Sequence, residues 1–278
     1  MNQPFPPGLY IVATPIGNLS DLTGRAAEVL KGADRVLAED KRVTAKLLHH
    51  IGAKVPMTAY NDHSDASLRE TVVADLHDKV VALVSDAGTP LISDPGYKLV
   101  RAARAAGAAV HTIPGPSAVI AALTLAGLPT DRFLFAGFLP PKAKARGDAL
   151  AELAGLRATL VFYESGPRLA ASLASMAEAL GNREAAVVRE ISKLHEETVA
   201  GSLAELAERY EGAPPKGEIV VVVSPPTAPQ AASDTDLDAA IDEALTRLSP
   251  SRAAAEVAER LGIPRKRAYA RALERAGN

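Results

Sequence analysis

The chain has 278 residues, of which 47% are hydrophobic and 23% are charged, and its formal net charge is −2. This composition is typical of a globular protein, and the length allows two domains. No apolar run approaches the roughly 20 residues of a membrane span, and residues 1–7 lack the pattern of a signal sequence, so we expect a cytoplasmic protein. The absence of cysteine, and of two histidines four residues apart with a glutamate between them, predicts no metal site.

The first half of the chain alternates strand patterns with helix patterns. Strands are predicted at residues 8–13, 33–38, 80–84 and 109–113, and helices up to about residue 31 and at 41–51, 66–77 and 97–106. This spacing favours a mostly parallel sheet built from βαβ crossovers. We therefore predict an α/β domain over residues 1–114.

A second α/β domain is predicted over residues 115–224. Two prolines flank a glycine at Pro114-Gly115-Pro116, a rigid turn suited to a domain junction where a cleft opens. The pattern then restarts with a helix at residues 117–126 and strands at 132–136, 159–163, 185–189 and 219–224.

The end of the chain has a different character. Residues 225–236 contain too little apolar content to form a core and predict a flexible linker. Helix patterns follow at residues 237–248, 251–261 and 264–276. The last two are joined by a short turn that contains a glycine, which is typical of a helix-turn-helix. From Ser251 onward the sequence has seven basic residues and three acidic ones, so we predict a basic helical domain over residues 237–278.

Two loops that leave predicted strands stand out. Thr14 to Leu19 follows the first strand, and Ser85 to Gly96 follows the apolar strand at residues 80–84. The second loop holds two glycines, two prolines and two acids within twelve residues, more than a simple turn requires. Neither loop is a dinucleotide fingerprint or a P-loop. The carboxylates favour a cationic ligand, or one rich in hydroxyl and amino donors.

Five motifs in order resemble one known family. They are the Tyr10 to Leu19 segment, Ala38-Glu39-Asp40, Ser85 to Pro90, Pro114 to Ala118, and Lys216-Gly217-Glu218. Together they resemble the tetrapyrrole methylase (class III) superfamily of S-adenosylmethionine-dependent methyltransferases. The closest branch is the one that 2′-O-methylates a cytidine ribose in small-subunit (16S) ribosomal RNA. The resemblance covers residues 8–224, and the linker and tail also fit.

The resemblance implies a homodimer of two-domain subunits that binds S-adenosylmethionine in the cleft between the domains. By motif, Asp86, Ala87, Gly88 and Thr89 contact the methionine end of the cofactor, and Pro15, Ser117 and Ala118 line the same pocket. Ile92 and Tyr163 are further wall residues, and Glu164 is a candidate for orienting substrate or cofactor. An acidic loop with exposed amides suits the cationic sulfonium and ammonium groups of this cofactor.

The acceptor side is predicted at residues 188–198, which follow another strand. A ribose hydroxyl is a poor acid, so a base or hydrogen-bond acceptor must raise its nucleophilicity. Glu190 is the first candidate base and His195 the second, while Lys193 is a candidate for holding a phosphate or the hydroxyl. An ordinary solvated loop is the alternative for each of them.

Clusters of cations predict contacts with RNA phosphates. Lys142, Lys144 and Arg146 lie on a proline-tethered loop that we expect to be mobile, and Arg265, Lys266 and Arg267 lie in the tail. Solvated surface is the alternative for both groups, and DNA binding remains open for the tail.

Three hypotheses remain open at this stage. The first is an rRNA ribose methyltransferase acting on ribosomal RNA or on the small ribosomal subunit. The second is a small-molecule methyltransferase of the tetrapyrrole type, against which the basic segments argue. The third is a non-catalytic nucleic-acid-binding regulator that keeps the cleft as a metabolite sensor.

Overall fold

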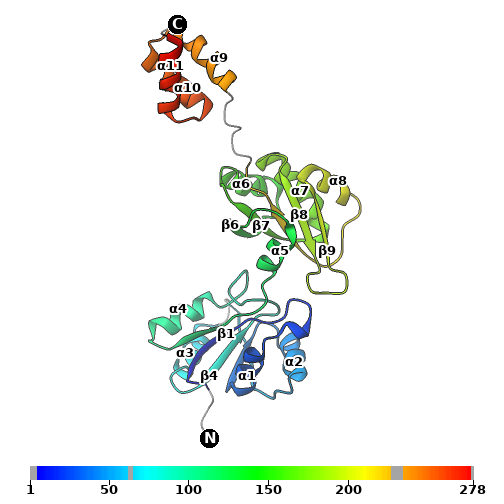
Figure 1. Cartoon of the computed structure of the whole chain (residues 1–278). Coiled ribbons are helices and arrows are strands. Elements are labelled where there is room, and N and C mark those ends of the chain that lie inside the picture. Colours follow the sequence, from blue (N-terminus) through cyan, green and yellow to red (C-terminus); the bar gives the residue numbers. More distant parts are fainter. Residues whose placement is uncertain (1–4, 62–64, 227–233, 277–278) are drawn as a thin grey trace. The chain divides into compact units, whose positions relative to one another are not determined.

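A computed structural model of the protein describes residues 5–61, 65–226 and 234–276 (Figure 1). The chain divides into two compact units, residues 1–225 and residues 226–278. Residues 227–233, which make up most of the predicted linker, lie outside the described residues. The first unit contains two sheets, each with its own helices, and we call these two parts the N-terminal and central lobes.

The N-terminal lobe is a parallel α/β sheet, as the sequence predicts. Its strands are β1 (Gly8–Val12), β2 (Arg35–Ala38), β3 (Met57–Ala59), β4 (Val80–Val84) and β5 (Val110–Ile113), in the order β3-β2-β4-β1-β5. Its helices are η1 (Leu19–Asp21), α1 (Gly24–Gly32), α2 (Lys41–His50), α3 (Ala66–Asp75) and α4 (Tyr97–Ala105). The short strand β3 is an addition to the prediction.

Both faces of this sheet are covered, which explains its apolar strands. All five residues of β1 and of β4 are buried. Residues of α1 and α2 pack on one face, with Val12, Ala82 and Val84, whereas residues of α3 and α4 pack on the other, with Ile11 and Leu83. The carboxyl ends of the strands are therefore the open edge of the sheet, where ligands of such folds bind.

The central lobe has a mixed sheet. Its strands are β6 (Phe133–Phe138), β7 (Thr159–Ser165), β8 (Glu184–Arg189), β9 (Glu197–Ser202) and β10 (Glu218–Val223), in the order β6-β7-β10-β8-β9. Only the pair β6 and β7 is parallel in this five-stranded sheet. Its helices are α5 (Ala118–Ala126), α6 (Ala143–Leu153), α7 (Gly166–Leu180) and α8 (Leu203–Tyr210).

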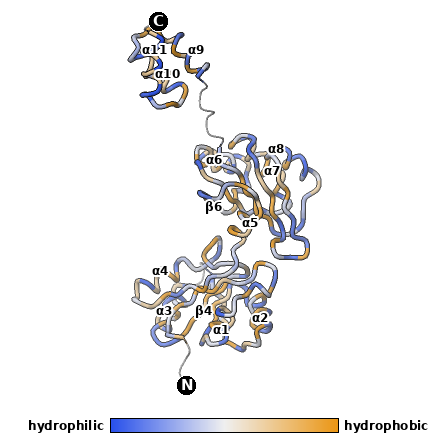
Figure 2. Tube along the Cα trace, in the orientation of Figure 1, coloured by the Kyte–Doolittle hydropathy of each residue, from blue (hydrophilic) through white to orange (hydrophobic). Residues whose placement is uncertain are grey.

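The two faces of the mixed sheet pack against different helices. Residues of α6, α7 and α8 form one core with Phe162, Val187 and Val221. The hydrophobic helix α5 covers the other face (Figure 2) and shares its core with Ile16 of the N-terminal lobe. Because α5 directly follows the Pro114–Pro116 turn, this packing brings the carboxyl ends of the first sheet toward the second.

The second unit is a bundle of α9 (Asp234–Leu245), α10 (Pro250–Leu261) and α11 (Arg265–Ala276). Apolar residues of all three helices form its core, among them Leu237, Ile241 and Val257. Gly262 ends α10 in the left-handed conformation, with φ of 62°, which only glycine adopts without strain. The predicted helix, glycine turn and helix are therefore present.

Candidate active site

Two strand exits of the N-terminal lobe are joined by backbone hydrogen bonds. The amide of Thr14 donates to Gly88 O at 2.8 Å, and the amide of Gly88 donates to Thr14 O at 3.1 Å. Gly88 has φ of 75°, and a Cβ there would lie 3.4 Å from Ile16. The loops after β1 and β4 are therefore one structure, and glycine adopts the left-handed backbone of this turn without strain.

Acidic side chains connect the exits of β2 and β4. The amide of Asp40 donates to Asp86 Oδ1 at 3.0 Å, and the amide of Asp86 donates to Glu39 Oε2 at 3.3 Å. Asp94 lies in the same loop, where Leu91 and Ser93 have positive φ although neither is glycine. This unusual backbone is typical of a functional loop held by its surroundings.

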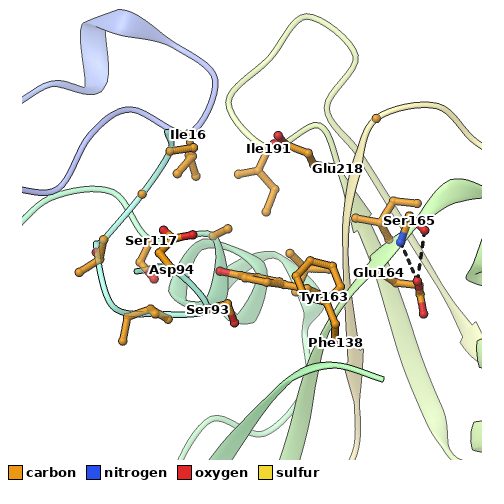
Figure 3. A pocket seen from close by; sticks show the side chains of 18 residues that line it. Ile16, Ser93, Asp94, Ser117, Phe138, Tyr163, Glu164, Ser165, Ile191 and Glu218 are labelled. Carbon is orange, nitrogen blue, oxygen red and sulfur yellow. Dashed lines mark hydrogen bonds between the residues drawn. The ribbon is translucent and has the colours of Figure 1, made fainter. Parts of the chain in front are cut away.

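A pocket of about 360 Å³ lies beyond these exits (Figure 3). Its volume falls in the range of small-molecule sites. The N-terminal lobe contributes Ile16 and the segment from Ala87 to Asp94, α5 contributes Ser117 and Ala118, and the central lobe contributes Phe138, Tyr163 to Ser165, Ile191 and Gly217 to Val220. A smaller adjoining cavity is lined by Pro15, Gly17, Leu19, Asp86 and Lys193, and shares Ile16, Ala87 and Glu218 with the first.

Tyr163 extends from β7 across the pocket toward the loop that holds Ser93 and Asp94 (Figure 3). Its ring packs edge-on against Phe135 at 4.7 Å and Phe138 at 5.4 Å between centroids. Burial raises the pKa of the Tyr163 phenol, and the charges of Asp94 and Glu218 add to this effect. The hydroxyl therefore stays protonated and is available as a hydrogen-bond donor.

Asp94 is the titratable group with the most unusual environment in the pocket. Burial raises its pKa to about 6, against a hydrogen bond from Ser85 that lowers it, and the charges of Glu39 and Asp86 raise it further. A carboxyl group with such a pKa changes its charge near neutral pH.

Glu164 is 3% exposed and serves as a hub of hydrogen bonds. One oxygen accepts from the amide of Ser165 at 2.8 Å, the other accepts from Ser172 Oγ, and Arg168 lies 3.4 Å away. The Arg168 guanidinium also donates to Leu139 O. Glu164 therefore fixes the start of α7 and the exits of β6 and β7, which hold Tyr163 and Phe138 in place.

The segment after β8 crosses to the N-terminal lobe. Glu190 and Ser192 have positive φ, the Ser192 hydroxyl donates to Asp21, and Ile191 lines the pocket beside Ile16. A Cβ on Gly17 would lie 2.8 Å from Ile191 O and would also overlap the Lys193 side chain. The loops after β1 and β8 are therefore packed so closely that no side chain fits at Gly17.

Lys193 and two glutamates form an ion cluster behind this contact. Lys193 Nζ donates to Glu190 Oε1 at 2.9 Å and to Glu218 Oε2 at 3.0 Å, and the amide of Glu218 also donates to Glu190 Oε1 at 3.1 Å. Lys193 lowers the pKa of the Glu190 carboxyl, and the amide of Glu218 adds to this. A Cβ on Gly217, which has φ of 99°, would overlap the Glu190 carboxylate, so the Lys216-Gly217-Glu218 motif makes room for this side chain.

The structure places the sequence-predicted cofactor residues together. Seven of them line the pocket: Ala87, Gly88, Thr89, Ile92, Ser117, Ala118 and Tyr163. Pro15 and Asp86 line the adjoining cavity. Sequence reasoning missed Phe138, Asp94 and Glu218 as lining residues. The signal for Asp94 was present, because it is the second acid of the unusual loop after β4.

The predicted acceptor residues are arranged differently from the expectation. Lys193 lines the adjoining cavity, but Glu190 and His195 line neither of the two cavities. Glu190 is held by hydrogen bonds that favour its charged form, which makes it a weak base, and His195 is exposed. No group of three potential metal ligands is found among the described residues.

Three of the predicted RNA-contacting cations have partners within the protein, and Lys144 is one of them, at 3.6 Å from Asp148. Arg146 is 8% exposed on α6, a helix rather than a mobile loop, and donates to Ser175 Oγ at 3.0 Å and Pro141 O at 3.2 Å. Arg267 pairs with Asp234 at 2.9 Å. The expectation of a phosphate contact is therefore corrected for Arg146, which is buried. Lys142, Lys144, Arg265 and Lys266 are exposed.

The pairing of Arg267 is one of a row of ion pairs between α11 and α9, which we call the ion-pair ladder. Arg267 pairs with Asp234, Arg271 with Asp238, and Arg275 with Asp242. Residues 234–276 contain eight basic and eight acidic residues, so the helical domain is not basic as a whole. Counting only from Ser251 omitted the acids of α9.

Comparisons with known proteins agree over nearly the whole chain. The family model described as tetrapyrrole (corrin/porphyrin) methylases matches residues 8–207, and the model described as the RsmI C-terminal HTH domain matches residues 231–276. Ribosomal RNA small subunit methyltransferase I of Erythrobacter litoralis is 58% identical over 273 residues, which cover 98% of this chain and 96% of the relative. The protein of that name from Escherichia coli O157:H7 is 43% identical, with 97% and 96% covered.

Solved structures share the fold of the first unit. Uroporphyrin-III C-methyltransferase from Thermus thermophilus, complexed with S-adenosyl homocysteine, has a TM-score of 0.53 at 23% identity and covers 77% of this chain and 96% of its own. Cobalt precorrin-4 methyltransferase has a TM-score of 0.58 at 18% identity and covers 78% and 94%. At these identities the likeness is one of fold alone.

Proposed function

Because this chain belongs to the ribosomal RNA small subunit methyltransferase I branch of the tetrapyrrole methylase family, we propose that it 2′-O-methylates a cytidine ribose in small-subunit ribosomal RNA. It is an S-adenosylmethionine-dependent methyltransferase, and the predicted fold class, two α/β domains with a cleft and a C-terminal helical domain, is confirmed. The observation that supports the proposal most is the similarity to rRNA methyltransferases over nearly the whole length of the chain. A cytoplasmic location is part of the proposal; no helix among the described residues is long and apolar enough to cross a membrane.

The pocket fits the cofactor on chemical grounds. S-adenosylmethionine supplies an electrophilic methyl group; its transfer breaks a carbon–sulfur bond, forms a carbon–oxygen bond and releases the hydroxyl proton. The turn at Ala87, Gly88 and Thr89 would present its backbone to the bound cofactor, and Ser117 and Ala118 line the same pocket next to this turn. Pro15 and Asp86 would border the bound cofactor, and Ile92 and Tyr163 would form its walls.

On the acceptor side, Lys193 is the predicted residue that lines a cavity. Its ammonium group is positioned to hold a ribose hydroxyl or a phosphate, because Glu190 and Glu218 fix it beside Asp86 and Ala87. Glu190 then acts by positioning Lys193 rather than as the base, and His195 is left as an exposed candidate near the incoming RNA.

The proposed RNA contacts are the exposed cations. Lys142 and Lys144 lie at the start of α6, and Arg265 and Lys266 lie at the start of α11. Neutralising phosphates with such residues gives binding that is insensitive to sequence and sensitive to salt. Arg267 contributes only if its pair with Asp234 opens.

A homodimer is also proposed, as the family resemblance implies. Large apolar side chains are exposed on the edge strand β6 and on α5: Phe133, Leu134, Phe138, Ile120 and Leu125. A second copy of the chain that covered them would also protect the edge of the sheet. Light scattering at micromolar concentration tests this proposal, since a monomer would contradict it.

The test of the proposed activity is a ribose-methylation map of rRNA from a strain that lacks the gene. We expect one cytidine of the small-subunit rRNA to lose its 2′-O-methyl group, the wild-type gene to restore it, and Asp86→Ala to restore little. Asp131→Ala is the matched control, because Asp131 is an exposed acid that lines neither cavity. An unchanged methylation map would refute the proposal, and methylation of a base instead of a ribose would correct the reaction.

A further inference from the structure

The charges that line the pocket are all negative. Asp94, Glu164 and Glu218 line it, whereas its lining contains no lysine, arginine or histidine. An acidic lining disfavours anionic ligands and favours cationic ones, provided that the charges are not already neutralised by the protein. The question is therefore which of the three carboxylates is available to a ligand.

Two of the three have a cationic partner within the protein. Glu164 lies 3.4 Å from Arg168 and accepts further hydrogen bonds, and Glu218 lies 3.0 Å from Lys193. Arg168 therefore balances the charge of Glu164, whereas Glu218 shares Lys193 with Glu190 and has a side chain that is 74% exposed, so water screens its charge.

Asp94 has no ion pair with a cation among the described residues. The groups that act on it are two acids, Glu39 and Asp86, the hydroxyl of Ser85 and the phenol of Tyr163 on the opposite wall (Figure 3). A partly buried carboxylate beside other acids is unfavourable unless a positive charge arrives to balance it. The missing partner of Asp94 is therefore a cation brought by the ligand.

Resting on the proposed function of this pocket, we propose that Asp94 supplies the negative charge by which the enzyme prefers its sulfonium methyl donor over the thioether product, S-adenosylhomocysteine. The donor and the product share the adenosine, the carboxylate and the ammonium group and differ by the methyl group and one positive charge. Shape and hydrogen bonds to the shared parts cannot separate them strongly, whereas one carboxylate in a pocket of this size can. Asp94 is thus a specificity residue that helps the product leave after transfer.

The test is isothermal titration calorimetry of both ligands across pH. A carboxyl with pKa of about 6 is mostly protonated at pH 5, so the wild-type affinity for S-adenosylmethionine should weaken by about tenfold between pH 7.5 and pH 5. The affinity for S-adenosylhomocysteine should change much less. This comparison needs no variant, so it remains valid if substitutions disturb folding.

Asp94→Asn provides the second arm. At pH 7.5 we expect it to weaken binding of S-adenosylmethionine by about tenfold while the affinity for the product stays within about twofold, and to remove the pH dependence. Asp131→Asn is the matched control, because Asp131 is an exposed acid that lines neither cavity.

Two results would overturn the inference. Equal weakening of both ligands in Asp94→Asn would make Asp94 a residue for shape or hydrogen bonding, and two unchanged dissociation constants would remove it from recognition altogether. Failure of the proposed function looks different: a wild-type protein that binds neither ligand has no cofactor site, and one that binds both but leaves rRNA unmethylated has another acceptor.

Discussion

Gly17→Ala tests whether the contact between the loops after β1 and β8 is needed for cofactor binding. Gly17 does not have positive φ, so its backbone accepts alanine, and the effect of the substitution comes from the added methyl group. That methyl would lie 2.8 Å from the carbonyl oxygen of Ile191 and would overlap Lys193. Neither neighbour yields easily, because one is backbone and the other is held by Glu190 and Glu218.

The size of the effect follows from this overlap. Inserting a methyl group into a filled contact costs about 1–3 kcal/mol. We assume that only the arrangement with Ile16 and Ile191 in place binds S-adenosylmethionine. A cost of this size lowers the population of that arrangement by about 5- to 150-fold, and the dissociation constant rises by the same factor. The two isoleucines share one apolar core and both line the pocket, so separating the loops also opens the cofactor site.

Calorimetric titration of Gly17→Ala with S-adenosylmethionine measures this effect, and Gly24→Ala is the control. No atom lies within 4 Å of a Cβ at Gly24, the first residue of α1, so that variant should bind like wild type. A dissociation constant for Gly17→Ala within about twofold of Gly24→Ala would refute the reasoning, because the overlap alone costs more than that ratio represents.

Four further predictions follow from individual side chains. Arg146→Met should lower the free energy of unfolding by about 1–3 kcal/mol, measured with urea, because it removes buried hydrogen bonds, and should leave the salt dependence of RNA binding unchanged. Lys142→Glu with Lys144→Glu should instead reduce the slope of log affinity against log salt by about two. Arg271→Ala should lower the melting temperature of the helical domain through loss of its pairs with Asp238 and Glu274, without altering cofactor affinity. Without cofactor, Asp94→Asn should have a higher melting temperature than wild type at pH 7.5 but not at pH 4. The pKa of Asp94 is raised in the folded state, so the folded wild type binds more protons than the unfolded chain, and its stability falls as the pH rises through about 6.

The sequence predicted the parts of the fold in which one local pattern decides the structure. The apolar run from Val80 to Val84 forms the expected buried strand, because burial on both faces requires apolar side chains throughout. The strand β9 was missed, since Glu197–Ser202 lies at the edge of its sheet and shows no clear apolar alternation. The antiparallel pairing in the central lobe was not predicted either, because strand direction depends on which strands distant in the sequence pair with one another.

Site residues were predictable when a motif identified them and not when their role depends on distant partners. Gly88 and Ser117 carry family motifs and line the pocket. Glu190 has the residue type of a base, but hydrogen bonds from Lys193 and from the amide of Glu218, 28 positions away, lower its pKa, and the first of them makes it a support for Lys193. Arg267 was assigned from local charge alone, although arginines at 267, 271 and 275 and aspartates at 234, 238 and 242 share the same four-residue spacing, which is the signal of a ladder between two helices.

The contrast between Asp86 and Asp94 shows how the loop after β4 divides two tasks. Asp86 follows the strand directly, and its contacts with Glu39 and Asp40 fix the exits of β2 and β4 relative to each other. Asp94, eight positions later, has no ion pair with a cation in the described part of the chain and faces Tyr163 across the pocket (Figure 3). The carboxylate of Asp86 therefore accepts a hydrogen bond from the backbone after β2, whereas the carboxyl of Asp94 lines the pocket. The long and strained segment between them follows from this division, since a shorter turn could not leave the first acid at the strand end and place the second in the pocket wall.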